Sequence, residues 1–168
     1  MITATPITSA NFAEFGEVID TSKAPHILIN NDLCKRFTDL ASFDMSDGTA
    51  GLSLFQSELR ATPYACDLLE RHPKGSQCFI PMGGSAYFVI TSADDAGKPS
   101  RNVKAYLALP HQCVNIFKNT WHGVLAPISG SGLFAVIDRI GTGQNLEEYA
   151  LPSPITIQPP DTDRGPTD

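Results

Sequence analysis

The fold of this chain is decided by one stretch, Glu70-Arg71-His72-Pro73-Lys74-Gly75-Ser76-Gln77-Cys78-Phe79-Ile80-Pro81-Met82-Gly83-Gly84. It sets a carboxylate, an imidazole and an amide close together (Glu70, His72 and Gln77) and then runs into an apolar segment that a glycine pair ends. About forty residues later a second histidine, His122, follows the only tryptophan in Asn119-Thr120-Trp121-His122-Gly123, which we interpret as a turn. Polar groups at separate points, each joined to strand-like sequence, converge inside a small β-barrel.

Outside this stretch the sequence predicts many short strands. We expect strands at residues 17–20, 26–29, 34–40, 51–57, 77–82, 86–91, 103–109, 113–117, 124–127 and 133–140. Short strands at roughly ten-residue spacing, with turn residues between them, favour a sandwich or a barrel. Two short helices are also predicted, at residues 8–16 and, after a Thr62-Pro63 start signal, at residues 64–71.

Length and composition are typical of one globular domain. The chain has 168 residues, with 42% hydrophobic and 18% charged side chains, enough for a sizeable core. We assign residues 1–151 to a single catalytic domain and the proline-rich residues 152–168 to a flexible tail. The net charge of −6, without a basic cluster, argues against nucleic acid and anionic membrane as partners. An anionic substrate would therefore need a local arginine or lysine.

The cysteines and the N-terminus indicate the cytoplasm. The four cysteines (Cys34, Cys66, Cys78 and Cys113) are scattered without a CxxC pair. The N-terminus has no signal-peptide pattern, and no apolar run approaches the roughly 20 residues that span a bilayer. We therefore expect free, mostly buried thiols in a reducing compartment.

The spacing of the polar residues resembles the two half-motifs of the cupin family, which implies a cupin-like (RmlC-like, jelly-roll) β-barrel. Cupin enzymes generally hold a metal with histidines and a glutamate at positions that correspond here to Glu70, His72, Gln77 and His122, with Gly84 as the motif glycine. The spacing fits, but the first histidine is replaced by Glu70 and the glutamate by Gln77. A neutral amide is a poor ligand for the ions that imidazole prefers.

These departures resemble a narrower family, the ureidoglycolate lyases of allantoin breakdown. The family block E-R-H-P-x-G-[ST]-Q-x-F-I-P-M matches residues 70–82, and W-H matches Trp121-His122. Further matches are Val114-Asn115, Ile137-Asp138-Arg139, Asn30-Asn31 and the block Arg36 to Leu40. The resemblance covers roughly residues 5–139. Single pieces such as W-H are weak, whereas the long block in order with the others is specific.

The resemblance implies an enzyme that cleaves ureidoglycolate to glyoxylate and urea, a carbon–nitrogen lyase of the amidine-lyase type in purine catabolism and nitrogen utilisation. It also implies a homodimer and a divalent metal, with nickel among the candidates. We expect the metal, where one is bound, at His72, His122 and Glu70. No organic cofactor is expected.

Collapse of ureidoglycolate, a hemiaminal with a carboxylate, needs a base, an acid and a clamp for the carboxylate. Histidine suits both proton transfers, so we predict His72 and His122 as the acid–base pair. Glu70 would orient an imidazole, and Gln77 would hydrogen-bond the ureido group. The predicted substrate-binding residues are Arg36, Asn115, Trp121, Asp138 and Arg139, with Arg36 or Arg139 as the clamp. Structural readings remain open, because Asp138 and Arg139 could form an ion pair and Trp121 could pack in the core.

Two other functions fit the residues less well. One is a metal-dependent cupin oxygenase, in which His72, His122 and Glu70 would form a two-histidine, one-carboxylate iron site. The other is a non-catalytic barrel that binds a small molecule. Because barrels of this type have many functions, the residue blocks decide between them and the fold does not.

Overall fold

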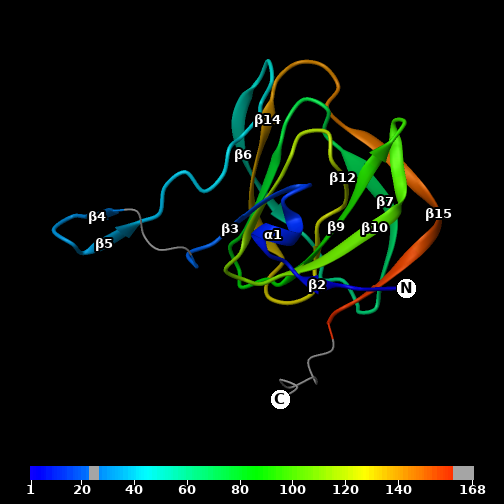
Figure 1. Cartoon of the computed structure of the whole chain (residues 1–168), viewed down its shortest axis with the longest axis horizontal. Helices are drawn as coiled ribbons and strands as arrows, with labels where there is room; N and C mark the ends of the chain where they lie inside the picture. Colours follow the sequence, from blue (N-terminus) through cyan, green and yellow to red (C-terminus); the bar gives the residue numbers. More distant parts are fainter. Residues whose placement is uncertain (23–26, 161–168) are drawn as a thin grey trace.

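Two β-sheets face each other in the computed structural model, which describes residues 1–22 and 27–160 (Figure 1). The larger sheet has the strand order β1-β15-β7-β12-β9-β10-β2, with β13 beside β9. Its strands are β1 (Ile2–Thr3), β2 (Thr5–Pro6), β7 (Tyr64–Arg71), β9 (Tyr87–Asp95), β10 (Lys98–Ala108), β12 (Trp121–Gly123), β13 (Ala126–Pro127) and β15 (Glu147–Gln158). The smaller sheet, in the order β3-β11-β8-β14-β6, consists of β3 (Gly16–Ile19), β11 (Cys113–Ile116), β8 (Gln77–Pro81), β14 (Leu133–Ile140) and β6 (Thr49–Gln56).

The N-terminal segment closes the larger sheet into a nearly complete barrel. β1 pairs with β15 at one edge, and β2 pairs with β10 at the other edge. Ala4, between these two strands, is buried, and its amide donates to the carbonyl of Gln158 at 2.8 Å. Since both edges are covered, the sheet curls around an apolar interior. The predicted mainly β, cupin-like barrel is confirmed.

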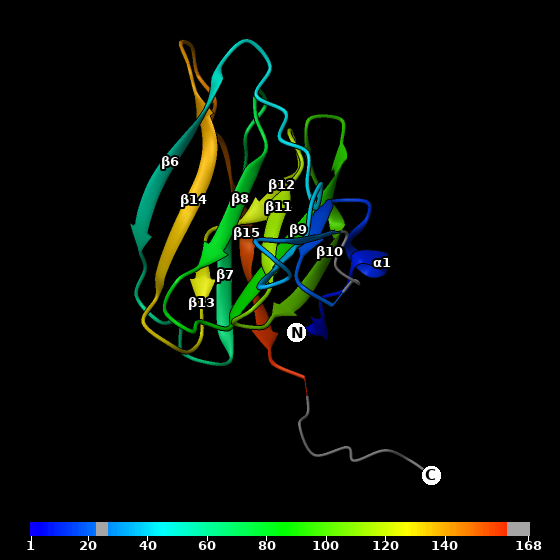
Figure 2. The same ribbon diagram turned by 90° about the vertical axis from the view of Figure 1, so that its left-hand side faces the viewer.

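Strand β9 is buried on both faces and separates two apolar cores. Its residue Tyr87 packs edge-on against Phe134 of the smaller sheet, with ring centroids 5.0 Å apart. The alternate residues Phe88 and Ile90 face the inside of the curled sheet, where Trp121 also lies. Because side chains alternate along a strand, the neighbour of Trp121 on β12 must point the other way, into the space between the two sheets. Figure 2 shows both layers from the side.

Two small elements lie outside these sheets. The helix α1 (Ser9–Phe12) is capped by Thr8, which forms a capping box with Asn11. The strands β4 (Ile27–Ile29) and β5 (Cys34–Arg36) form a separate hairpin that extends away from the body (Figure 1). In the described ranges, no helix is long and apolar enough to cross a membrane.

The predicted helix at residues 64–71 is wrong, because this segment is strand β7. Its residues form one ladder with β12 and another with β15. Sheet pairing on both sides outweighs a local helical preference. The other predicted helix, at residues 8–16, forms only as the single turn α1, since Gly16 already begins β3.

Two further predictions need correction. Trp121 and His122 lie on strand β12 and not in a turn. The flexible tail does not begin at residue 152, because β15 continues to Gln158 and accommodates Pro152 and Pro154 where its register with β7 shifts. Residues 161–168 of that tail, and His26 of the strand predicted at 26–29, lie outside the described residues.

Candidate functional site

Glu70 and His122 are brought together by the register of two neighbouring strands. β7 and β12 pair so that Glu70 and His122 are directly opposite. Directly opposed residues of an antiparallel pair carry their side chains on the same face. The Oε1 atom of Glu70 lies 3.6 Å from the Nε2 atom of His122, which is fully buried. This pair therefore forms one wall of a polar centre between the sheets.

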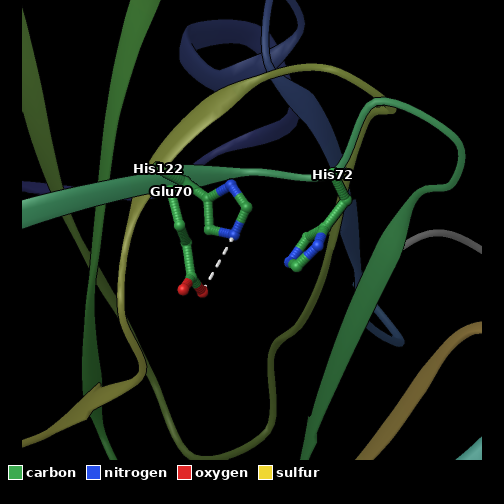
Figure 3. Close-up of side chains that lie close together, drawn as sticks. All are labelled: Glu70, His72 and His122. Carbon is green, nitrogen blue, oxygen red and sulfur yellow. Dashed lines mark ion pairs between the residues drawn. The ribbon is translucent and has the colours of Figure 1, made fainter. Parts of the chain in front are cut away.

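His72 adds a second imidazole from the loop that connects the two sheets. It follows the last residue of β7, and its backbone carbonyl accepts a hydrogen bond from the amide of Asn119 at 2.9 Å. The rings of His72 and His122 are 5.3 Å apart between centroids. Figure 3 shows both rings and the Glu70 carboxylate pointing toward a common space.

Backbone carbonyls fix the tautomers of both imidazoles. The Nδ1 atom of His72 lies 2.7 Å from the carbonyl of Asn145, and that of His122 lies 2.8 Å from the carbonyl of Thr120. A carbonyl oxygen only accepts, so each Nδ1 carries the proton. In a neutral ring this leaves the Nε2 lone pair free, and both Nε2 atoms are buried without a hydrogen-bond partner.

This donor set fits a metal ion. One ligand atom from each of Glu70, His72 and His122 lies within 4.8 Å of the others. Imidazole nitrogens held by Nδ1–H hydrogen bonds to carbonyls are the usual arrangement of metal-binding histidines. Two nitrogens and one carboxylate suit a divalent transition ion, whose identity the residues leave open.

The electrostatics keep the imidazole of His72 neutral and the Glu70 carboxyl ionised at pH 7. Burial, followed by the proximity of His122, lowers the pKa of His72 below its ordinary value. Burial alone would raise the pKa of Glu70, but the neighbouring His122 and His72 outweigh it, so that this pKa is lowered. The centre therefore combines a basic nitrogen with a negative oxygen.

Gln77 and Asp138 come close to the same centre from the smaller sheet. Gln77 begins β8 and is buried, and its Oε1 atom has no hydrogen-bond partner. Burial raises the pKa of the Asp138 carboxyl, whereas the nearby imidazole of His72 and the amide of Gln77 act in the opposite direction. Glu70, His72, Gln77, His122 and Asp138 thus form one cluster, which we call the polar centre.

Two of the predicted substrate-binding residues face away from the polar centre. Trp121 points into the barrel interior, and its Nε1 donates to Asp94 at 3.0 Å. Asn115 lies in the smaller sheet, where its Nδ2 donates to Glu17 at 2.8 Å and to the carbonyl of Ser42 at 3.1 Å. The contacts that Asn115 makes attach the segment around Ser42 to the sheet.

Neither predicted carboxylate clamp reaches the polar centre within this chain. Arg139 follows Asp138 on β14, so its side chain lies on the opposite face of the smaller sheet. On that outer face it pairs with Asp47. Arg36 is exposed on the projecting β4–β5 hairpin. The structural reading of the Asp138-Arg139 pair also fails, because these two side chains lie on opposite faces of the sheet.

A cleft of about 490 Å³ opens beside the polar centre. Glu70 lines it together with Phe55, Val124 and Leu125, and Arg60 lies in the same wall. No motif surrounds Arg60, so nothing in the sequence indicated it as a functional residue. A larger groove of about 840 Å³ is lined by His72, so each of the two contains one residue of the polar centre, Glu70 in the first and His72 in the second.

The fold and the polar centre define a class: a cupin-like barrel that holds two histidines and carboxylates at one end. The family model described as ureidoglycolate lyase matches residues 1–158, and the chain belongs to this family.

Relatives from several bacteria agree with this assignment. The chain is 49% identical to the "Ureidoglycolate lyase" of Rhodobacter capsulatus over 154 residues, which covers 91% of this chain and 95% of the relative. It is 40% identical to a protein of the same name from Rhizobium etli, covering 92% of this chain and 94% of that protein. For the relative from Chelativorans sp. the identity is 39%, over 95% and 98% of the two chains.

Proposed function

We propose that this protein cleaves ureidoglycolate into glyoxylate and urea, as a carbon–nitrogen lyase of the amidine-lyase type. The observation that carries the proposal is the pair of buried, unpartnered Nε2 atoms of His72 and His122 beside the Glu70 carboxylate. Family membership supplies the substrate. The alternatives considered from the sequence, an oxygenase and a non-catalytic binding barrel, gain no support from the family or the relatives.

The reaction is an internal collapse that consumes no water. The substrate hydroxyl gives its proton to the Nε2 atom of His72, which is available because the low pKa of this histidine keeps the ring neutral. The carbonyl of glyoxylate forms as the carbon–nitrogen bond breaks, and the electron pair leaves with the urea nitrogen. The proton then passes from His72 to the Nε2 atom of His122, which lies beside the Glu70 carboxylate, and from there to that nitrogen, so that both rings end neutral. Each positioned proton transfer contributes roughly 10²–10⁴-fold to the rate.

The remaining residues of the polar centre bind and orient the substrate. The unpartnered Oε1 atom of Gln77 accepts a hydrogen bond from the ureido group, and this explains why an amide replaces the usual glutamate. Where a divalent ion such as nickel is bound, Glu70, His72 and His122 would hold it, and it would supply Lewis-acid activation of a substrate oxygen in place of proton transfer at the two imidazoles. We place the enzyme in the cytoplasm, in allantoin degradation.

We also propose a homodimer, which is supported by the outer face of the smaller sheet. Leu52 and Leu54 of β6 are 70% and 65% exposed, although their neighbour Phe55 packs inward. Their cross-strand partners on this face are Ile137 and Ala135. Exposed apolar residues in a row on an edge strand favour association with another protein surface. We expect the same face of a second copy of the chain to cover them.

Glyoxylate formation from ureidoglycolate tests the proposed function. The parent should release glyoxylate well above the spontaneous rate, and His122→Asn should reduce the enzymatic rate by roughly 10²-fold or more. The matched control is His111→Asn, because His111 is an exposed histidine in the connection between β10 and β11 and lines neither cleft. Release by the parent at the spontaneous rate would refute the function. An unchanged rate in His122→Asn would refute the role of this histidine.

A further inference from the structure

The polar centre has two histidines and two carboxylates but no cation, so the charge of the substrate carboxylate must be met elsewhere. Of the basic side chains in the described ranges, Arg71, Lys104, Lys118 and Arg139 are engaged in ion pairs. Lys35, Arg36, Arg60, Lys74, Lys98 and Arg101 form no ion pair in the described ranges, and of these only Arg60 lines the cleft that Glu70 also lines. It is therefore the cation to consider for the carboxylate.

The backbone directs the Arg60 side chain toward the polar centre. The amide of Arg60 donates to the carbonyl of Pro127 at 2.7 Å, and its Nη2 atom reaches back to the carbonyl of Leu125 at 3.5 Å. The side chain thus runs along the segment from Pro127 to Leu125. This segment continues into Gly123, which pairs with Leu69, the residue before Glu70. Arg60 and Glu70 thus line the same cleft from two segments that this pairing connects.

The guanidinium of Arg60 is poorly satisfied in this position. Its Nε atom is buried without a partner, and the contact to Leu125 is at the long limit of a hydrogen bond. The same carbonyl also accepts a hydrogen bond from Ser57. A carboxylate would supply two acceptors to the guanidinium fork and neutralise its charge.

We propose that Arg60 binds the carboxylate of the substrate in the cleft beside the polar centre. The inference rests on the proposed function and specifies which residue makes the enzyme selective for an acid. The ureido-bearing carbon would then lie between Arg60 and the Glu70–His122 pair. The 490 Å³ cleft is large enough for a molecule of this size.

Two substrates that differ only in the carboxylate test this proposal. N-(hydroxymethyl)urea is the same hemiaminal with hydrogen in place of the carboxylate. Arg60→Gln should lower kcat/KM for ureidoglycolate by roughly tenfold to a hundredfold, because a charged hydrogen bond is lost. It should leave turnover of N-(hydroxymethyl)urea unchanged, and Arg60→Lys should restore part of the loss. Arg101→Gln, at an exposed arginine of β10, is the matched control and should behave as the parent.

The outcomes separate this inference from the proposed function. Equal losses for both substrates would mean that Arg60 only supports the structure, and no loss would mean that another group binds the carboxylate. If the parent cleaves neither substrate, the proposed function fails. Calorimetric titration with glyoxylate then decides whether Arg60 binds a carboxylate. Weaker glyoxylate binding by Arg60→Gln than by the parent would still support the carboxylate site, whereas equal binding, or none by the parent, would overturn it.

Discussion

Gln77 is the residue at which this chain departs most from a metal-binding cupin. It stands where the family pattern of cupins has a glutamate, and its Oε1 atom is buried without a partner near His72. A neutral amide there leaves Glu70 as the one carboxylate among the three described residues whose ligand atoms lie within 4.8 Å of one another. The position therefore determines how strongly a cation is held.

We expect Gln77→Glu to bind nickel more tightly than the parent, because it adds a negative oxygen ligand beside two imidazole nitrogens. We also expect a chelator to strip metal from the parent without unfolding it, since apolar strands form both cores. Calorimetric titration with nickel before and after chelation checks both points. Equal nickel affinities would show that Gln77 does not face the histidines.

The buried thiols give a second test at the scale of single residues. Burial raises the pKa of Cys66 to about 11 and that of Cys78 to about 12. Because the thiolate is the reactive form, neither should be alkylated by iodoacetamide in the folded protein at pH 8. Cys34, partly exposed on β5, is the internal positive control. Mass spectrometry of the digested protein gives the result, and labelling of Cys78 as fast as Cys34 would contradict the packing.

At the scale of elements, the close approach of β3 to β11 depends on a glycine. A Cβ atom on Gly16 would lie 2.1 Å from the backbone oxygen of Asn115, which the ladder between these strands holds in place. Gly16→Ala should therefore lower the free energy of unfolding by about 1–3 kcal/mol in a urea titration. Gly84→Asn is the control, since that turn has open space and asparagine tolerates its positive φ. An equally small effect for both variants would contradict the predicted clash.

The sequence predicted the elements that carry a regular pattern and missed those defined by distant pairing. The strand at residues 133–140 agrees with β14 in both bounds, because a short apolar run there follows the turn residues 129–132. β7 was predicted as a helix and β12 as a turn because each becomes a strand only by pairing. These two strands pair with each other although they are more than fifty residues apart in the sequence. β1 and β2 are too short for any pattern, yet they close the barrel.

The same distinction applies to the candidate site. The family blocks located Glu70, His72, Gln77 and His122, and strand register then brought them together. Arg139 and Trp121 belong to the same blocks, but the alternation of side chains turns them away from the polar centre. Arg60 could not be found by any motif, because only the folding of residues 125–127 against it places its side chain in the cleft.

For the whole molecule, the exposed apolar face of β6 and β14 predicts how two copies associate. Leu54→Lys should shift the protein from dimer toward monomer, because a buried lysine at an interface is desolvated without a partner. Analytical ultracentrifugation at several concentrations measures this shift. The control is Leu59→Lys, an exposed leucine in the loop after β6, which should leave the distribution unchanged. A Leu54→Lys protein with the same mass as the parent would place the interface elsewhere.

The central claim is that the barrel breaks the carbon–nitrogen bond of ureidoglycolate and releases urea intact. Its most direct test is the nitrogen balance of the parent, with glyoxylate, urea and ammonia measured in the same reaction in the absence of urease. Because the polar centre moves one proton from oxygen to nitrogen and uses no water, we predict one urea for each glyoxylate and no ammonia. Two ammonia molecules for each glyoxylate, without urea, would make the enzyme a hydrolase and contradict the account.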